Sequence, residues 1–304
     1  ALPVPERVAD LLSRMSLEEK VGQMLQLDAR DCLEDHVLRK HAGSILHTSP
    51  ERILQANQLT AETRLRIPLL VAEDCIHGHS FWEGATISPT QLGMAASWDP
   101  GLLERVARAT AVEVAATGVH WTFSPVLCLG RDTRWGRIDE TFGEDPYLSG
   151  EMTYGIVKGY QGDSLDAPDS ILACAKHYIG YGEAVGARDA VDTQMTYRKM
   201  KEVFVPPFQR AVDAGCATFM TAYGSIDGHP FTADPKTMKT ILRDEMGFDG
   251  FVVTDWNNCE SLMKQQFVAE SMEDCAIQSA EAGNDMIMST LGFYDAALNA
   301  VRTG

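Results

Sequence analysis

The sequence predicts an α/β fold of the (β/α)8 TIM-barrel type, possibly irregular, and two observations lead to it. Short apolar runs of strand length alternate with amphipathic helical patterns along all 304 residues, and no run follows the previous one at hairpin spacing. No repeat, low-complexity tract or Pro/Gly/Ser-rich linker interrupts this alternation. Residues 1–304 are therefore expected to form one barrel domain.

Seven runs have the length and composition of buried strands. They cover residues 43–47, 68–74, 120–127, 171–179, 217–223, 251–256 and 284–288. Helical patterns separate all of them, and parallel strands need such crossover connections. The runs are therefore expected to pair in parallel.

The helical patterns have recognisable ends. Capping residues and terminal glycines bound three of them, which begin after Asp99, Asp234 and Ser271 and end at Gly118, Gly247 and Gly283. Near the N-terminus, Ser16 and Glu19 have the spacing of a capping box for a helix over residues 17–25.

Composition excludes several classes of protein. The net charge of −17 disfavours nucleic acid and anionic membranes as partners, whereas a neutral ligand such as a sugar is compatible with it. No apolar run of membrane-spanning length and no signal peptide is evident. The seven cysteines are scattered and odd in number, which favours free thiols. We expect a cytoplasmic protein; a secreted or periplasmic one with its signal removed remains the alternative.

Polar side chains follow the predicted strands, where a barrel gathers its catalytic groups. They are Glu73 and Asp74, the segment 131–137, Lys176 and His177, Tyr223, and Asp255 and Trp256. No GxGxxG or Walker loop follows a strand, which disfavours a nucleotide site. Such acidic, basic and aromatic groups suit a site that binds sugar hydroxyls and stacks on a sugar ring.

These strand-end residues also have structural interpretations. Two interpretations of Asp255 are equally well supported by this stretch: a catalytic carboxylate, or the N-cap of the following helix. His177 taken alone would more often be a core histidine, and adjacent residues such as Lys176 and His177 point to opposite faces of a continuing strand. We interpret His36, His41, His47 and His120 as structural.

The pair His77 and His79 raises a metal hypothesis. An HxH motif at a strand end begins the ligand set of metal-dependent amidohydrolase barrels, but such sites need further imidazoles from later strands. The later strand ends carry Tyr223 and Asp255 instead. The sequence therefore favours a site without metal or cofactor.

Five ordered motifs carry a resemblance: EDCIHG, RWGRIDETFGEDPYLSGE, KHYIGYGEAVGARDA, FMTAYGSIDG and GFDGFVVTDW. From about residue 8 to 289, the chain resembles the catalytic barrel of glycoside hydrolase family 3. Members of this family are mostly exo-acting β-glucosidases and β-xylosidases with a retaining mechanism. The resemblance implies release of β-linked glucose or xylose from oligosaccharides or from aryl and alkyl glycosides, and it leaves the choice of sugar open.

The resemblance also implies residue roles. Asp255 matches the family's nucleophile, and a carboxylate suits double displacement because it can both attack the anomeric carbon and leave it. Trp256 would form an apolar wall, and Tyr223 would lie near the nucleophile. The remaining matches to sugar-binding residues are Asp74, Arg137, Lys176, His177 and Arg188. We expect Arg134 to form a structural ion pair with Glu140 or Glu144.

Two departures from the family pattern qualify these expectations. The histidine acid/base of the N-acetylhexosaminidase branch is missing from GYGEAVGARDA. The sequence also ends within the segment that corresponds to the final barrel helix of the family. The resemblance therefore implies a general acid from a C-terminal domain or a second chain. The alternative is a non-catalytic sugar-binding or structural subunit. A homo-oligomer remains open.

Overall fold

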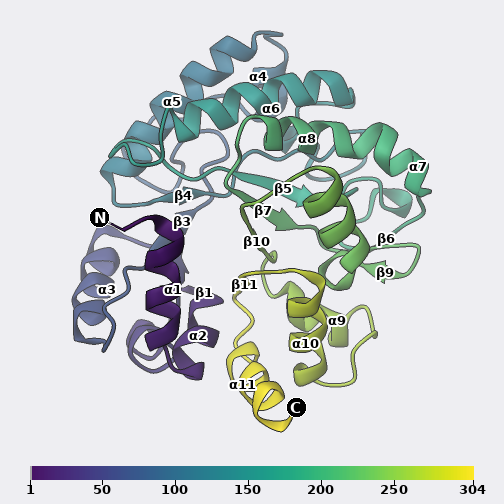
Figure 1. Cartoon of the computed structure of the whole chain (residues 1–304). Coiled ribbons are helices and arrows are strands. Elements are labelled where there is room, and N and C mark those ends of the chain that lie inside the picture. The colour runs from purple at the N-terminus through teal and green to yellow at the C-terminus, as the bar shows by residue number, and fades with distance from the viewer. Residues whose placement is uncertain (1) are drawn as a thin grey trace.

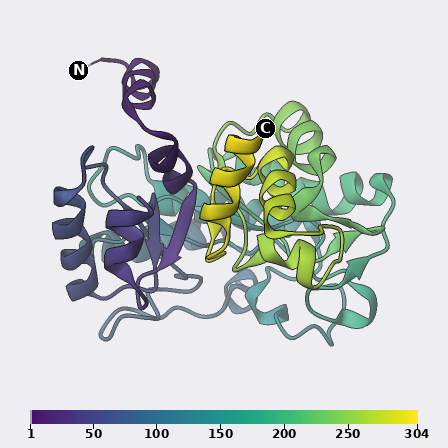
Figure 2. The ribbon, with the colours of Figure 1, turned by 90° about the horizontal axis from the view of Figure 1, so that it is seen from below.

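The computed structural model describes residues 2–304, and its helices surround a central set of strands (Figure 1). Turning the molecule shows helix α1 standing away from the body at the N-terminal end (Figure 2), and α1 buries none of its residues. The eleven α-helices of this part of the chain are α1 Val4–Arg14, α2 Leu17–Gln23, α3 Pro50–Glu62, α4 Gln91–Ala95, α5 Pro100–Ala116, α6 Pro146–Gln161, α7 Tyr197–Lys199, α8 Val205–Asp213, α9 Asn258–Lys264, α10 Met272–Ala282 and α11 Phe293–Thr303.

Shorter or wider helical segments complete the connections. The three of π type are η1 Asp35–Arg39, η4 Met200–Phe204 and η6 Lys236–Glu245, and the three 3₁₀ turns are η2 Ile138–Glu140, η3 Val185–Ala187 and η5 Phe231–Ala233. The strands are β1 Leu25–Asp28, β2 Ser44–Leu46, β3 Leu70–Glu73, β4 Trp121–Thr122, β5 Cys174–Tyr178, β6 Asp192–Thr193, β7 Thr218–Thr221, β8 Ser225–Ile226, β9 His229–Pro230, β10 Phe251–Val253 and β11 Ile287–Met288.

The main strands pair in parallel, as predicted. Five lie in the order β11-β1-β2-β3-β4 and three in the order β10-β7-β5. Isolated parallel bridges link the two groups, one between Trp121 and Leu172 and one between Val253 and Met286. The result is a curled parallel sheet with helices outside it, which confirms the α/β class and is consistent with a TIM-like barrel.

One close approach explains a glycine in this sheet. Gly250 directly precedes β10, and a Cβ atom there would lie 2.1 Å from the carbonyl oxygen of Ala217, next to β7. Glycine therefore allows β10 to pair with β7, and this pairing brings Asp255 to the pocket end of the sheet.

The predicted helix starts at Ser16, Asp99 and Ser271 are confirmed. Ser16 and Glu19 form the expected capping box, and Asp99 and Ser271 accept backbone N–H groups at the starts of α5 and α10. Each of these caps satisfies donors that the first helical turn leaves unpaired.

One sequence prediction was wrong, and one hairpin lies outside the seven predicted strand runs. Residues 17–25 do not form one helix, because α2 ends at Gln23 and Leu25 opens β1, a buried strand that forms a ladder with both β2 and β11. A hairpin also exists, since β8 and β9 pair antiparallel around Asp227 and Gly228, both at positive φ. The Asp-Gly dipeptide was the local signal for that turn.

A separate apolar cluster lies along the strands of the curled sheet. It includes Leu46, Trp121, Phe123, Met220 and Met288, all nearly inaccessible to solvent. The indole N–H of Trp121 donates to Thr218 Oγ1 at 2.8 Å, so its one polar atom is satisfied. This layer supplies a rigid apolar floor for the polar groups at the strand ends.

All seven cysteines are free, and six of them are buried. Across residues 2–304, none of the helices combines the length and the apolar character needed to cross a bilayer.

Candidate active site

A pocket of about 130 Å³ lies where the carboxyl ends of the parallel strands meet. Strands β2, β3, β4, β5, β7, β10 and β11, or the segments that follow them, supply its walls. Its lining residues are Leu46, His47, Asp74, Phe123, Arg137, Lys176, His177, Met220, Asp255, Trp256 and Met288. Six of the eight predicted site residues are among them, so the fold gathers groups that are up to 182 positions apart in the sequence.

Asp255 follows β10, and its side chain is 12% exposed. One carboxylate oxygen accepts the backbone N–H of Trp256 at 2.6 Å, and the other has no hydrogen-bond partner among the described residues. Burial raises the pKa of Asp255 to about 6, although Lys176 and Arg137 oppose this rise by favouring the anion. The geometry therefore presents a free, poorly solvated carboxylate oxygen in the pocket.

Lys176 and His177 both line the pocket from β5, and the peptide bond between them is cis. The expectation that adjacent strand residues point to opposite faces was wrong here. The Lys176 ammonium donates to Asp74 Oδ1 at 2.6 Å, and the lysine side chain is only 5% exposed. This partly buried ion pair joins β5 to the end of β3 and leaves the second oxygen of Asp74 available.

His177 is held as a neutral ring. Burial, reinforced by the nearby charges of Arg137 and Lys176, lowers its pKa well below the usual value. Its Nε2 lies 3.4 Å from Arg137 Nη2 and 3.5 Å from Asp255 Oδ2. Since the ring is neutral, the contact with Asp255 is not an ion pair, and Nε2 accepts from Arg137.

Arg137 reaches the pocket from the loop after β4. Its guanidinium donates twice to Glu140, at 2.7 Å on each oxygen. Burial disfavours the charge, but the two hydrogen bonds with Glu140 outweigh it and raise the pKa of Arg137. The prediction for the loop's ion pair was therefore wrong: Arg137 pairs with Glu140, whereas Arg134 is exposed and pairs with Asp132.

Three predicted residues remain: Trp256 lies at the rim of the pocket, and Tyr223 and Arg188 are not among its lining residues. Trp256 is 38% exposed at the pocket rim, and the hydroxyl of Tyr223 donates to its carbonyl oxygen at 2.6 Å. Burial and the nearby Asp255 carboxylate raise the pKa of Tyr223. Arg188 follows η3 as an exposed side chain and is not among the pocket residues.

His47 is a pocket residue that the sequence interpretation missed. It follows β2, its Nδ1 lies 3.0 Å from Asp28 Oδ2, and its ring packs on Trp256 with 5.2 Å between ring centroids. The structural interpretation of His47 therefore left out its place in the pocket lining. Its position directly after a strand was the available signal, but Asp28 belongs to the strand that the sequence did not reveal.

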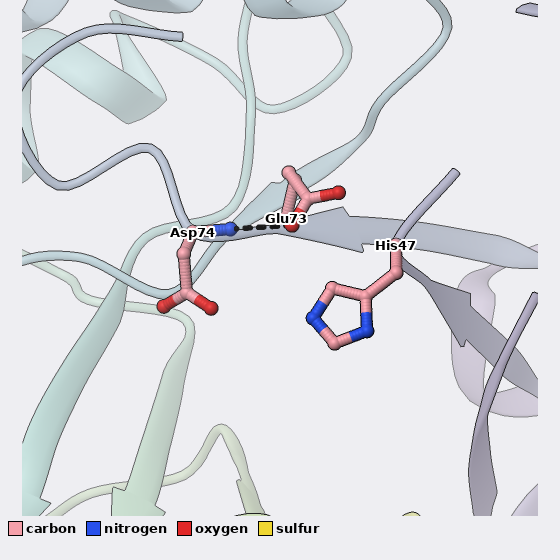
Figure 3. Close-up of side chains that lie close together, drawn as sticks. All are labelled: His47, Glu73 and Asp74. Carbon is pink, nitrogen blue, oxygen red and sulfur yellow. Dashed lines mark hydrogen bonds between the residues drawn. The ribbon is translucent and has the colours of Figure 1, made fainter. Parts of the chain in front are cut away.

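The HxH motif does not contribute to this pocket. His77 contacts the carbonyl oxygen of Ser88, and His79, fully buried, contacts Thr117 and Cys75. The three groups that do converge are His47, Glu73 and Asp74, whose potential ligand atoms lie within 4.8 Å of one another (Figure 3). Asp74 in this cluster already binds the ammonium of Lys176.

The pocket holds one carboxylate with an unpaired oxygen, and the groups around it are of different chemical types. Asp255 offers one unpaired oxygen, while Asp74, Lys176, Arg137 and His177 offer charged or polar groups around it. Such groups bind hydroxyls, and the exposed indole of Trp256 provides a flat apolar surface at the rim. The site therefore combines one unpaired carboxylate oxygen with charged, polar and aromatic groups of the kinds that can contact a polyhydroxylated ring.

Sequence and structure comparisons identify the class. The family model described as the glycosyl hydrolase family 3 N-terminal domain matches residues 16–304. A periplasmic β-glucosidase of Salmonella typhimurium is 33% identical over 289 residues, which cover 93% of this chain and 37% of the relative. A β-xylosidase of Formosa agariphila is also 33% identical, covering 93% of this chain and 36% of the relative. The chain belongs to glycosyl hydrolase family 3.

Solved structures agree with this assignment. A β-glucosidase involved in saponin metabolism, from intestinal bacteria, matches with a TM-score of 0.93 and 51% identity, covering 98% of this chain and 40% of that one. The Listeria innocua β-glucosidase in complex with glucose matches with a TM-score of 0.92 and 32% identity, covering 98% and 44%. The chain thus spans about two fifths of the length of these relatives.

Proposed function

We propose that the chain is the catalytic barrel domain of a retaining, exo-acting β-glycosidase. Its substrates would be β-linked oligosaccharides and aryl or alkyl β-glycosides with glucose or xylose at the non-reducing end. The observation that carries the proposal is the buried Asp255 carboxylate, with one oxygen free inside a pocket lined by sugar-binding groups. The β-glucosidase and β-xylosidase names of the relatives, and the glucose complex of the Listeria enzyme, support the substrate class.

The reaction would proceed in two displacements. Asp255 Oδ2 attacks the anomeric carbon, and the bond to the aglycone oxygen breaks with its electron pair while a general acid protonates that oxygen. Water, deprotonated by the same group, then attacks the anomeric carbon of the glycosyl ester and frees Asp255. Two inversions retain the β configuration.

The other pocket residues would bind and orient the sugar. The free oxygen of Asp74 accepts from a hydroxyl, Lys176 and Arg137 supply cationic donors, and the neutral ring of His177 supplies an acceptor. Trp256 forms the wall where the aglycone leaves. Arg188 remains a predicted sugar ligand, and a complex with a bound monosaccharide would test it.

We infer that the general acid comes from a second domain or a separate chain. The two glutamates of the loop after β4 are poor candidates: both oxygens of Glu140 accept from Arg137, and Glu144 is exposed and absent from the pocket lining. The limited coverage of the longer relatives supports the same inference.

We also infer that the eight strands β1, β2, β3, β4, β5, β7, β10 and β11 make a complete ring. The two isolated bridges that link the five-stranded and three-stranded groups support it. A cytoplasmic location remains a prediction, and the Salmonella relative is named periplasmic.

The need for an external acid predicts a strong dependence on the leaving group. Protonation of a departing alkoxide is worth about 10²–10⁴-fold, whereas a dinitrophenolate leaves without it. Residues 1–304 expressed alone should therefore hydrolyse dinitrophenyl β-glucoside slowly and cellobiose almost undetectably. Adding the C-terminal part should restore cellobiose hydrolysis and change the dinitrophenyl rate much less.

Both substrates would be assayed with the isolated chain and with the assembled protein, and light scattering would verify that the parts associate. Equal cellobiose rates would place the acid within these 304 residues. Failure of the assembled protein to hydrolyse any aryl glycoside would instead favour a sugar-binding or structural subunit.

The pKa of Asp255 predicts the acid side of the pH profile. Only the carboxylate attacks, so kcat/KM for dinitrophenyl β-glucoside should fall about tenfold per pH unit below about pH 6. Lys176→Met should move this limb to higher pH, because the lysine charge lowers the pKa of Asp255. An acid limb near pH 4 in the unaltered protein would contradict the buried environment of this carboxylate.

A further inference from the structure

His47 occupies a distinct position at the pocket wall. It lies directly after β2 with a positive φ of 55°, and its side chain is 21% exposed. Strand β2 carries none of the groups assigned to catalysis above, so His47 approaches the pocket from the side of β1 and β2. The side chain contacts the site without belonging to the network of Lys176, His177 and Arg137.

Asp28 determines which ring nitrogen of His47 faces the pocket. The Asp28 carboxylate accepts from Arg30 Nη2 at 2.6 Å and lies 3.0 Å from His47 Nδ1. Burial would raise the pKa of Asp28, but the hydrogen bonds from Arg30 and His47 outweigh burial and lower it to about 2. An ionised carboxylate only accepts, so Nδ1 carries a proton and Nε2 is the ring nitrogen that can accept a hydrogen bond.

The free side of the ring faces two carboxylates. Figure 3 shows the imidazole turned toward Asp74, with Glu73 beside them, and the potential ligand atoms of all three residues lie within 4.8 Å of one another. Glu73 is 1% exposed, and its Oε1 accepts the backbone N–H of Asp74. Lys176 uses one oxygen of Asp74. The acceptors that remain toward the pocket are therefore His47 Nε2 and the second oxygen of Asp74.

Two acceptors at this spacing suit two neighbouring hydroxyl groups. Each hydroxyl of a pyranose brings one O–H donor, and adjacent hydroxyls can donate to the imidazole and to the carboxylate separately. A site with a buried acceptor rejects an analogue that lacks the matching hydroxyl, because the acceptor is then left without a partner.

We propose that His47 is a specificity-determining residue: its Nε2 accepts a hydrogen bond from the sugar hydroxyl adjacent to the one that binds Asp74. This role rests on the proposed glycosidase function. In it, Arg30 holds Asp28, and Asp28 orients His47 toward the bound sugar. The ring also packs on Trp256, tilted by 39°, so it steadies the rim as well.

Two substitutions separate hydrogen bonding from packing. His47→Phe keeps a ring against Trp256 and removes the acceptor, and the φ of 55° at Phe267 shows that this chain holds a phenylalanine in that conformation elsewhere. His47→Asn keeps a side-chain acceptor and tolerates positive φ, but removes most of the ring contact. His229→Phe, on an exposed residue of β9, is the matched control.

The test compares kcat/KM of the complete protein for an aryl β-glucoside and its four monodeoxy analogues at positions 2, 3, 4 and 6. The unaltered protein and His229→Phe should lose about 10–100-fold on the analogue lacking the hydroxyl that His47 binds. His47→Phe should lose a similar factor on the parent glucoside and discriminate against that analogue by less than threefold. His47→Asn should retain part of the discrimination. Thermal melting checks that each variant is folded.

Equal discrimination by His47→Phe and the unaltered protein at every position would overturn the proposal. Calorimetric binding of glucose and its monodeoxy forms separates this outcome from failure of the glycosidase function. If the protein binds these sugars but turns over no glycoside, the Kd values still show whether His47 forms a hydrogen bond with a sugar hydroxyl. Loss of discrimination at all positions together would mean that His47 only packs against Trp256.

Discussion

Asp255→Asn is expected to reduce turnover of aryl β-glucosides by at least about 10⁴-fold while the fold survives. The amide cannot form the glycosyl ester, and loss of a covalent nucleophile has effects of this size. Asp255→Gly should show partial activity when azide is added, because the azide anion can occupy the vacated space and attack the anomeric carbon. Product analysis would then reveal a glycosyl azide of inverted configuration.

The substitution Asp255→Asn should also stabilise the folded protein at neutral pH. The pKa of Asp255 is about 6 in the folded state, above its ordinary value of 3.8, so ionisation of this carboxylate costs folding free energy above pH 6. The cost amounts to about 3 kcal/mol, and Asp255→Asn removes it. Below about pH 4 the carboxyl is protonated in both states, and the advantage of the variant should disappear.

Urea unfolding at pH 4 and pH 7 measures this difference, with Asp249→Asn as the control. Asp249 is exposed and precedes the same strand, so its substitution should change neither activity nor stability. Full activity of Asp255→Asn would remove the nucleophile assignment. Equal stability at both pH values would contradict the desolvated carboxylate.

Asp74→Ala is expected to lower kcat/KM about 10³-fold. The substitution removes the acceptor for a sugar hydroxyl and leaves the Lys176 ammonium buried without its partner. Leaving a buried donor without its partner costs about 1–3 kcal/mol. Stability should therefore fall together with activity.

The double variant Asp74→Ala/Lys176→Met separates the two effects. Removing the orphaned charge should recover most of the lost stability, but activity should stay low because the hydroxyl acceptor is still absent. Asp166→Ala, at an exposed aspartate whose side chain has no hydrogen bond among the described residues, is the control. If Asp74→Ala left kcat/KM nearly unchanged, this residue would have no contact with the substrate.

Local patterns predicted much of the fold because their causes are local. The caps at Asp99 and Ser271 satisfy nearby backbone donors, and the apolar run before Asp255 is buried on both faces of the sheet. The strand β1 escaped prediction because Leu25–Asp28 directly follows a helical pattern, and its apolar residues continue that pattern. Its strand conformation comes from pairing with β2 and β11.

Ion-pair partners were harder to predict than the residues of the site. Arg134 and Arg137 lie in the same short loop before Glu140, yet Arg137 pairs with Glu140 and Arg134 pairs with Asp132. Arg188 illustrates the same limit, because the exposure of the segment after η3 follows from its packing and not from the residue type.

By itself the sequence determined the parallel α/β class, the helix caps and the placement of Asp74, Lys176, His177 and Asp255 at strand ends, since each depends on periodicity or on neighbouring residues. Only the tertiary structure decided that Lys176 pairs with Asp74, that His177 is held neutral, and that Asp28 orients His47 against the pocket. These features arise where strands distant in the sequence curl together, because burial and the charges across the barrel set the protonation and orientation of each side chain.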